Sequence, residues 1–115
     1  MFEFSQRVES GVTVLTLKGQ LDALTAGKIK PFLEDLLMNR SVYIVYDLND
    51  LSLIDSSGIG VIVSTFKRTR ALGGNTIVAG IVNQPKQVFN VLCLHKYMEL
   101  CDSVEEAISK LSPKK

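Results

Sequence analysis

The sequence has no tryptophan, a single histidine and two cysteines, and its charges nearly cancel. Lys and Arg number 13 and Asp and Glu number 12, which gives a formal net charge of +1. Duplex nucleic acid is bound mainly by neutralising its phosphates, so this balance argues against nucleic acid as a direct partner. Charged or turn residues interrupt every apolar run before about 18 residues. We therefore expect no membrane span, no membrane partner, no signal peptide and a cytoplasmic location.

The rare residue types also argue against metal, cofactor and hydrolase chemistry. Cys93 and Cys101 lack CxxC spacing and have no neighbouring ligand set, so we expect both to be buried apolar residues. No metal and no cofactor is predicted. The only histidine, His95, has no specific reason to meet a serine, and a Ser-His-Asp triad would need that meeting.

The residues that are abundant predict one globular domain. The chain has 115 residues, of which 46% are hydrophobic and 22% are charged. Apolar, β-prone runs at 2–8 and 12–18 indicate an opening hairpin, and runs at 42–48 and 76–82 indicate buried strands. The expected fold is α/β: a mixed, mostly parallel sheet that starts with an N-terminal hairpin and has helices packed against it. This domain should span 1–111, with 112–115 as a disordered tail.

Helices are predicted between these strands. An apolar stripe between Ile29 and Leu37 indicates a helix that starts close to Pro31 and ends near Asn39, with 25–30 as a looser turn or kinked first segment. Pro85 fits the first position of a short helix. Residues 98–101 favour a short edge strand, and Ser103 has the capping-box spacing for a last helix over 104–111.

The most informative segment is 51–60, where an apolar run ends in Asp55-Ser56-Ser57-Gly58 and a helix pattern follows. Asp and Ser are common helix caps, so Asp55 or Ser56 is expected to cap this helix. The first turn of a helix has free N–H groups and a partial positive charge. A phosphate on Ser57 would therefore be tolerated there.

The helix beginning in this segment is predicted to have two different faces. Ile59, Ile62, Val63 and Phe66 share the core-facing side of the helix. The opposite side should face solvent, with small residues that allow close approach, and it comprises Ser57, Gly60, Val61, Ser64 and Arg68.

Residues 55–60, preceded by Tyr46-Asp47-Leu48 and Gly19-Gln20-Leu21-Asp22, resemble the bacterial anti-sigma factor antagonists, which are small single-domain STAS proteins. The resemblance implies that Ser57 is the phosphorylation site and that an anti-sigma factor with serine-kinase activity is the partner. It also implies a serine phosphatase that removes the phosphate. The expected partner surface comprises Asp22, Asp55, Ser56, Gly58, Gly60, Val61, Ser64 and Arg68.

Other functions stay open for the same residues. The Asp-Ser-Ser-Gly motif can be no more than a structural cap, or the chain can be a STAS interaction module for another partner, such as a phosphatase. A small hydrolase is disfavoured because neither Ser56 nor Ser57 has the flanking glycines of a nucleophile elbow. A nucleotide-handling enzyme is disfavoured because the partial glycine fingerprint after Asp55 lacks its third glycine and no P-loop is present.

Overall fold

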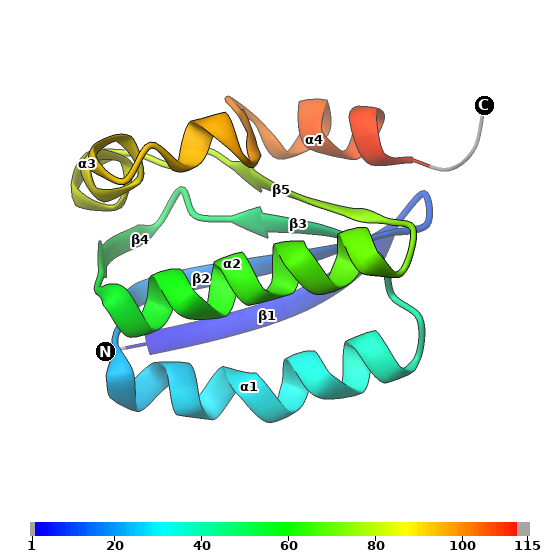
Figure 1. Cartoon of the computed structure of the whole chain (residues 1–115), viewed down its shortest axis with the longest axis horizontal. Coiled ribbons are helices and arrows are strands. Elements are labelled where there is room, and N and C mark those ends of the chain that lie inside the picture. The colour runs from blue at the N-terminus through cyan, green and yellow to red at the C-terminus, as the bar shows by residue number, and fades with distance from the viewer. Residues whose placement is uncertain (1, 113–115) are drawn as a thin grey trace.

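A computed structural model describes residues 2–112 of the chain (Figure 1). The strands are β1 (Phe2–Glu9), β2 (Val12–Leu21), β3 (Tyr43–Asp47), β4 (Leu51–Ile54), β5 (Asn75–Ala79) and β6 (Glu99–Cys101). The helices are α1 (Ala23–Met38), α2 (Ser56–Ala71), α3 (Asn83–Val91) and α4 (Val104–Leu111), with a short 3₁₀ turn η1 (Leu94–Lys96). The order of these elements confirms the predicted α/β class.

The six strands form one mixed sheet in the order β1-β2-β3-β5-β6, and β4 pairs with the end of β2. β1 and β2 are an antiparallel hairpin, whereas the other pairs are parallel. Ser10 and Gly11 at the hairpin turn both have positive φ, as a tight primed turn requires. β3 lies at the centre, and successive side chains, Tyr46 and Val45, enter the cores on opposite faces. The central position predicted for this strand is confirmed.

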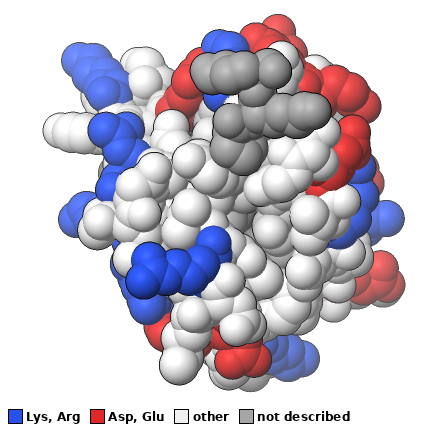
Figure 2. All heavy atoms as spheres, turned by 90° about the vertical axis from the view of Figure 1, so that its right-hand side faces the viewer, with Lys and Arg blue, Asp and Glu red and all other residues white. Residues whose placement is uncertain are grey.

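Helices cover both faces of the sheet. α1 and α2 lie side by side on one face and run in the same direction (Figure 1). α4 covers the other face, where Ala107 and Ile108 pack against Val14, Val45 and Ile77. α3 packs beside β4. At the end where α1 and α2 finish, Figure 2 shows charged side chains of both signs scattered around a largely uncharged centre.

The path of α1 differs from the sequence prediction. Instead of beginning near Pro31, the helix is continuous from Ala23 and contains Pro31 in its interior. A capping box begins it, because the side chains of Asp22 and Thr25 each accept a hydrogen bond from the other residue's N–H. Pro31 is exposed, and burial of Ile29 and its neighbours holds the helix on the sheet despite the missing hydrogen bond.

Smaller corrections concern the second half of the chain. Pro85 is the third residue of α3, not the first, and it is tolerated because N–H groups of a first turn have no helical partner. β5 ends at Ala79, three residues before the predicted end of that strand. Cys101 is buried as expected, but Cys93 is exposed.

The last helix begins and ends where it was predicted. α4 spans the predicted residues, and the Ser103 side chain accepts from the Glu106 N–H at 3.1 Å. Ser112, assigned to the disordered tail, follows α4 and donates its N–H to the Ile108 carbonyl at 2.8 Å. Positions 113–115 lie outside the described residues. No helix within 2–112 is long and apolar enough to cross a bilayer.

Candidate functional site

The candidate site begins where two parallel strands end. Leu21 of β2 and Ile54 of β4 are register partners, so the residues that follow them, Asp22 and Asp55, leave the sheet at the same edge. The Asp55 N–H donates to the Leu21 carbonyl at 3.2 Å and ties the two chain segments together. The starts of α1 and α2 are therefore held side by side.

Each of these aspartates caps the helix that follows it. Asp22 accepts from the Thr25 N–H at 3.1 Å, and Asp55 accepts from the Gly58 N–H at 3.1 Å. The hydrogen bond from Thr25 lowers the pKa of the Asp22 carboxyl below its usual range. Of the two caps that the sequence allowed for α2, the structure selects Asp55 and leaves Ser56 as the first helical residue.

The two serines of the motif have different surroundings. Ser56 is exposed, whereas Ser57 is half-buried in the first turn of α2. Within residues 2–112 neither hydroxyl makes a side-chain hydrogen bond, so neither is used as a cap. The Ser57 hydroxyl is therefore available for modification, and it lies at an ordered helix start.

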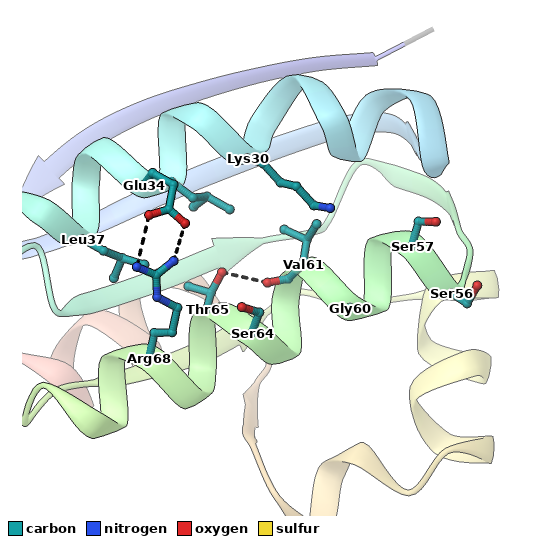
Figure 3. Close-up of a pocket in the computed structure, with 11 residues that line it drawn as sticks. Lys30, Glu34, Leu37, Ser56, Ser57, Gly60, Val61, Ser64, Thr65 and Arg68 are labelled. Atoms are coloured by element: carbon teal, nitrogen blue, oxygen red, sulfur yellow. Dashed lines mark hydrogen bonds and ion pairs between the residues drawn. The ribbon is translucent and has the colours of Figure 1, made fainter.

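Ser57 lies at one end of a groove between α1 and α2 that has a volume of about 460 Å³ (Figure 3). Ser56, Gly60, Val61, Ser64 and Arg68 of α2 also line it. The structure thus brings together most of the predicted partner surface. Asp22 and Asp55 hold the helix starts, and they are not among the residues that line this groove.

Val61 is not on an open surface as the sequence predicted. Only 4% of it is exposed, because α1 packs against this side of α2 and covers it. The side of α2 that faces the sheet carries Ile62, Thr65 and Thr69, while Val63 and Phe66 are only half-buried. The predicted core face was thus wrong in part, since α2 is covered on two sides.

Buried hydroxyls fix how α2 sits on the sheet. The Tyr46 hydroxyl of β3 lies 2.7 Å from the Thr65 Oγ1, and Thr69 Oγ1 lies 2.8 Å from Thr76 Oγ1 of β5. Burial raises the pKa of Tyr46 far above its usual value, so this hydroxyl stays protonated and serves only as a hydrogen-bonding group. These contacts hold α2 in one rotation, and they determine which side chains reach the groove.

Two glycines of α2 have opposite surroundings. A Cβ atom on Gly58 would lie 2.7 Å from the Leu21 carbonyl oxygen and 2.7 Å from an Ile54 side-chain carbon, so no larger residue fits without movement. A Cβ atom on Gly60 would meet nothing within 4 Å. Gly58 is therefore needed to pack the helix start, and Gly60 leaves an open surface beside Ser57.

Four α1 residues that line the groove were missed by the sequence reasoning: Lys30, Leu33, Glu34 and Leu37. Their spacing of three, four and seven residues is a helical stripe that the sequence displays. The Arg68 guanidinium donates to both Glu34 carboxylate oxygens, at 2.5 and 3.1 Å (Figure 3). This pair lowers the pKa of Glu34 and raises that of Arg68. Arg68, predicted as a partner contact, is already engaged across the groove.

A second, more apolar groove lies on the other side of the α2 start, and Ile59, Val88 and Leu92 are among the residues that line it. The Gln84 side chain, which also lines it, accepts from the Ile54 N–H at 2.9 Å and donates to the Ile54 carbonyl at 3.1 Å. This amide thereby satisfies the unpaired edge of β4 immediately before Asp55. The sequence offered no signal for that contact.

A hydrolase with a Ser-His-Asp triad would need a histidine near the serine, but His95 lines neither groove described above. His95 is exposed in η1, at the end of the α3 segment. No cluster of three metal-ligating side chains is present within residues 2–112. The chemistry of the described site is therefore that of hydroxyls, a lysine and an ion pair around an ordered helix start.

Comparison with known proteins identifies the family. The family model described as STAS domain matches residues 3–107. The chain belongs to the STAS domain family. The anti-sigma F factor antagonist of Paenibacillus polymyxa is 28% identical over 102 residues, which cover 88% of this chain and 87% of that protein. The anti-sigma-B factor antagonist of Listeria monocytogenes is 30% identical over 82 residues, covering 71% and 72%.

One similar solved structure is of a phosphorylated protein. The structure of the Bacillus cell fate determinant SpoIIAA in its phosphorylated form is 25% identical, with a TM-score of 0.74 over 96% of this chain and 98% of that chain. The named relatives of this chain are thus regulatory binding proteins, and one of them has been observed with a phosphoryl group.

Proposed function

We propose that this chain is an anti-sigma factor antagonist that acts by partner switching in the cytoplasm. Unphosphorylated, it binds an anti-sigma factor with serine-kinase activity, and the sigma factor is released. Phosphorylated at Ser57, it dissociates, and a serine phosphatase restores it. The observation that carries the proposal is the place of Ser57: half-buried in the first turn of α2, with no side-chain hydrogen bond within residues 2–112, and beside an open face and a groove. The names of two relatives, which concern sigma F and sigma B, support the class of partner.

The local geometry suits a phosphorylation switch. In the reaction the Ser57 oxygen forms a bond to the γ-phosphorus of ATP, the bond from that phosphorus to ADP breaks, and the hydroxyl proton is released. The phosphoryl group adds about −1.5 to −2 charges, which the N–H groups of the α2 first turn stabilise in the free protein. Against a partner without matching cations, the same charge costs several kcal/mol of binding free energy. Such a loss weakens affinity about a hundredfold or more.

The proposal is tested with the anti-sigma factor kinases encoded beside candidate sigma factors in the source genome. Incubation with ATP followed by phosphopeptide mapping should place the phosphate on Ser57, and Ser57→Ala should remain unlabelled. Calorimetry should show that Ser57→Asp binds the kinase at least about a hundredfold more weakly than wild type, whereas Ser57→Ala binds and is not released by ATP.

Ser56→Asp is the matched control, because it adds the same charge one residue earlier at an exposed position. It should bind more tightly than Ser57→Asp. Stoichiometric labelling of Ser56 in the Ser57→Ala protein would refute the assignment of the site. If no anti-sigma factor kinase bound, the chain would be a STAS module for another partner, such as a phosphatase, and the proposed function would be wrong.

A further inference from the structure

The groove beside Ser57 contains three charged side chains, and two of them neutralise each other. Lys30 and Glu34 come from α1, and Arg68 comes from α2. Glu34 and Arg68 form the two-pronged ion pair at the far end from Ser57 (Figure 3). Within residues 2–112, no ion pair or hydrogen bond engages the Lys30 ammonium. Lys30 is therefore the uncompensated charge of this groove.

The Lys30 ammonium is directed toward the half of the groove that contains Ser57. α1 and α2 start from the same sheet edge and run in the same direction (Figure 1). Lys30 lies about two turns past the start of α1, and Ser57 lies in the first turn of α2. Long side chains on a helix lean toward its N-terminus, which takes the ammonium back toward the level of Ser57. In Figure 3 the Lys30 side chain extends from α1 across the groove toward α2, above Val61.

We propose that Lys30 is the cation that receives the phosphoryl group of phosphorylated Ser57. This inference rests on the proposed function, in which Ser57 is the modified residue. It assigns Lys30 a role in the switch. In the unmodified protein the Lys30 ammonium is free to bind a partner, and in the phosphorylated protein it pairs with the phosphoryl group of the same chain.

Phosphorylation of Ser57 changes the sign of the net charge in the groove. With Lys30, Glu34 and Arg68 as its charged lining residues, the unmodified groove has a formal charge of +1. Addition of about −1.5 to −2 charges makes it negative. An acidic group of a partner would be attracted to the first form and repelled by the second. Phosphorylation thus removes a binding group and adds a repulsive one in a single step.

The test measures the ionisation of the phosphoryl group itself. Phosphoserine is incorporated at position 57 during translation, and its ³¹P chemical shift is followed against pH; the second pKa of such a group lies near 6. The proposed pairing brings the ammonium near the phosphoryl group and favours its dianion; for a separation of about 6 Å in water, Lys30→Gln should raise this pKa by about 0.5. Lys30→Arg keeps the charge and should leave the pKa near the wild-type value.

Lys28→Gln is the matched control. Lys28 is exposed on the same helix, carries the same charge and does not line the groove. Its removal should shift the phosphoserine pKa far less than removal of Lys30. The difference in phosphoserine pKa between the wild-type and Lys30→Gln proteins should also shrink in about 1 M salt, where the Debye length is about 3 Å. The other charged group next to Ser57, the cap Asp55, is unchanged in all variants.

Equal pKa values in the Lys30→Gln and Lys28→Gln proteins would overturn the inference. Both lysines are exposed, so both variants are expected to fold, and amide spectra would verify this. Because the phosphoserine is encoded, the titration needs neither kinase nor partner. A negative result therefore removes the role of Lys30 and leaves the proposed function intact. Absence of kinase labelling at Ser57 would instead refute the proposed function, and the role of Lys30 in the switch would be refuted with it, whatever pKa values the titration gave.

Discussion

Alanine at the two glycines of α2 should shift stability in opposite directions. The substitutions are Gly58→Ala and Gly60→Ala, which add the same methyl group to the same helix two residues apart. At Gly58 the new carbon would lie 2.7 Å from the Leu21 carbonyl oxygen, a backbone atom that the sheet holds in place. At Gly60 the methyl group would meet nothing within 4 Å.

The magnitudes follow from these surroundings. Overpacking of a fixed site costs about 1 to 3 kcal/mol, so Gly58→Ala should be destabilised by about that amount. Gly60→Ala gains helix propensity without a clash, and its free energy of unfolding should rise by about 0.8 to 1 kcal/mol. For a domain of this size, 1 kcal/mol corresponds to about 4 °C in Tm. The two variants should therefore melt at clearly different temperatures.

Urea unfolding measures stability, and calorimetry with the anti-sigma factor measures binding. The m-values should stay constant while the midpoints move apart. If the face beside Ser57 is approached closely by the partner, Gly60→Ala should bind about tenfold more weakly although it is more stable. A Gly58→Ala midpoint equal to wild type would refute the packing argument. A Gly60→Ala protein that binds like wild type would show that this face lies outside the interface.

Three further predictions test the packing and the electrostatics. Val61→Glu places an unpaired charge between two helices and should lower the free energy of unfolding by about 3 to 5 kcal/mol. Ser64→Arg on the exposed face should change that free energy by about 0.5 kcal/mol or less, and thermal melts compare the two variants. Gln84→Ala leaves two backbone groups of β4 unpaired, so urea unfolding should show a loss of about 1 to 3 kcal/mol, against little change for Gln87→Ala. Ionisation of the Asp22 cap adds stability to the fold, because the folded pKa of this carboxyl is lowered by the hydrogen bond from Thr25. Its contribution is therefore complete above the unfolded pKa near 4 and is lost as the pH falls through the lower folded pKa; Asp22→Asn should flatten the stability profile in that window.

Local patterns in the sequence predicted most of the architecture. The hairpin, the central strand and α4 follow from alternation, continuous apolar runs and cap residues, which act over a few neighbouring positions. α4 begins after its predicted cap Ser103 because that hydrogen bond forms within one turn. The position of Ser57 at the start of a helix was predictable for the same reason.

The parts that were not predicted depend on contacts between distant segments. A periodic pattern reports that a helix has an apolar side, and it does not report how many neighbours cover the helix. Val61 is buried because α1 lies over it, and Thr65 is buried because Tyr46 provides a hydrogen-bond partner. The ion pair of Glu34 with Arg68 joins residues 34 positions apart. Local rules contain no information about such pairs.

The proline inside α1 gives the groove two mechanically different ends. Pro31 has no N–H group, so the carbonyl one turn earlier, on Gly27, has no partner within the helix. Bending of a helix concentrates at such a gap. Beyond it, the bonds between Glu34 and Arg68 join α1 to α2. The turns before it are held on the sheet by the Asp22 cap and by burial of Ile29, and no ion pair within residues 2–112 joins them to α2. The groove is thus bridged by an ion pair at one end, and Ser57 lies at the other end, where no such pair has to be broken for a group to enter.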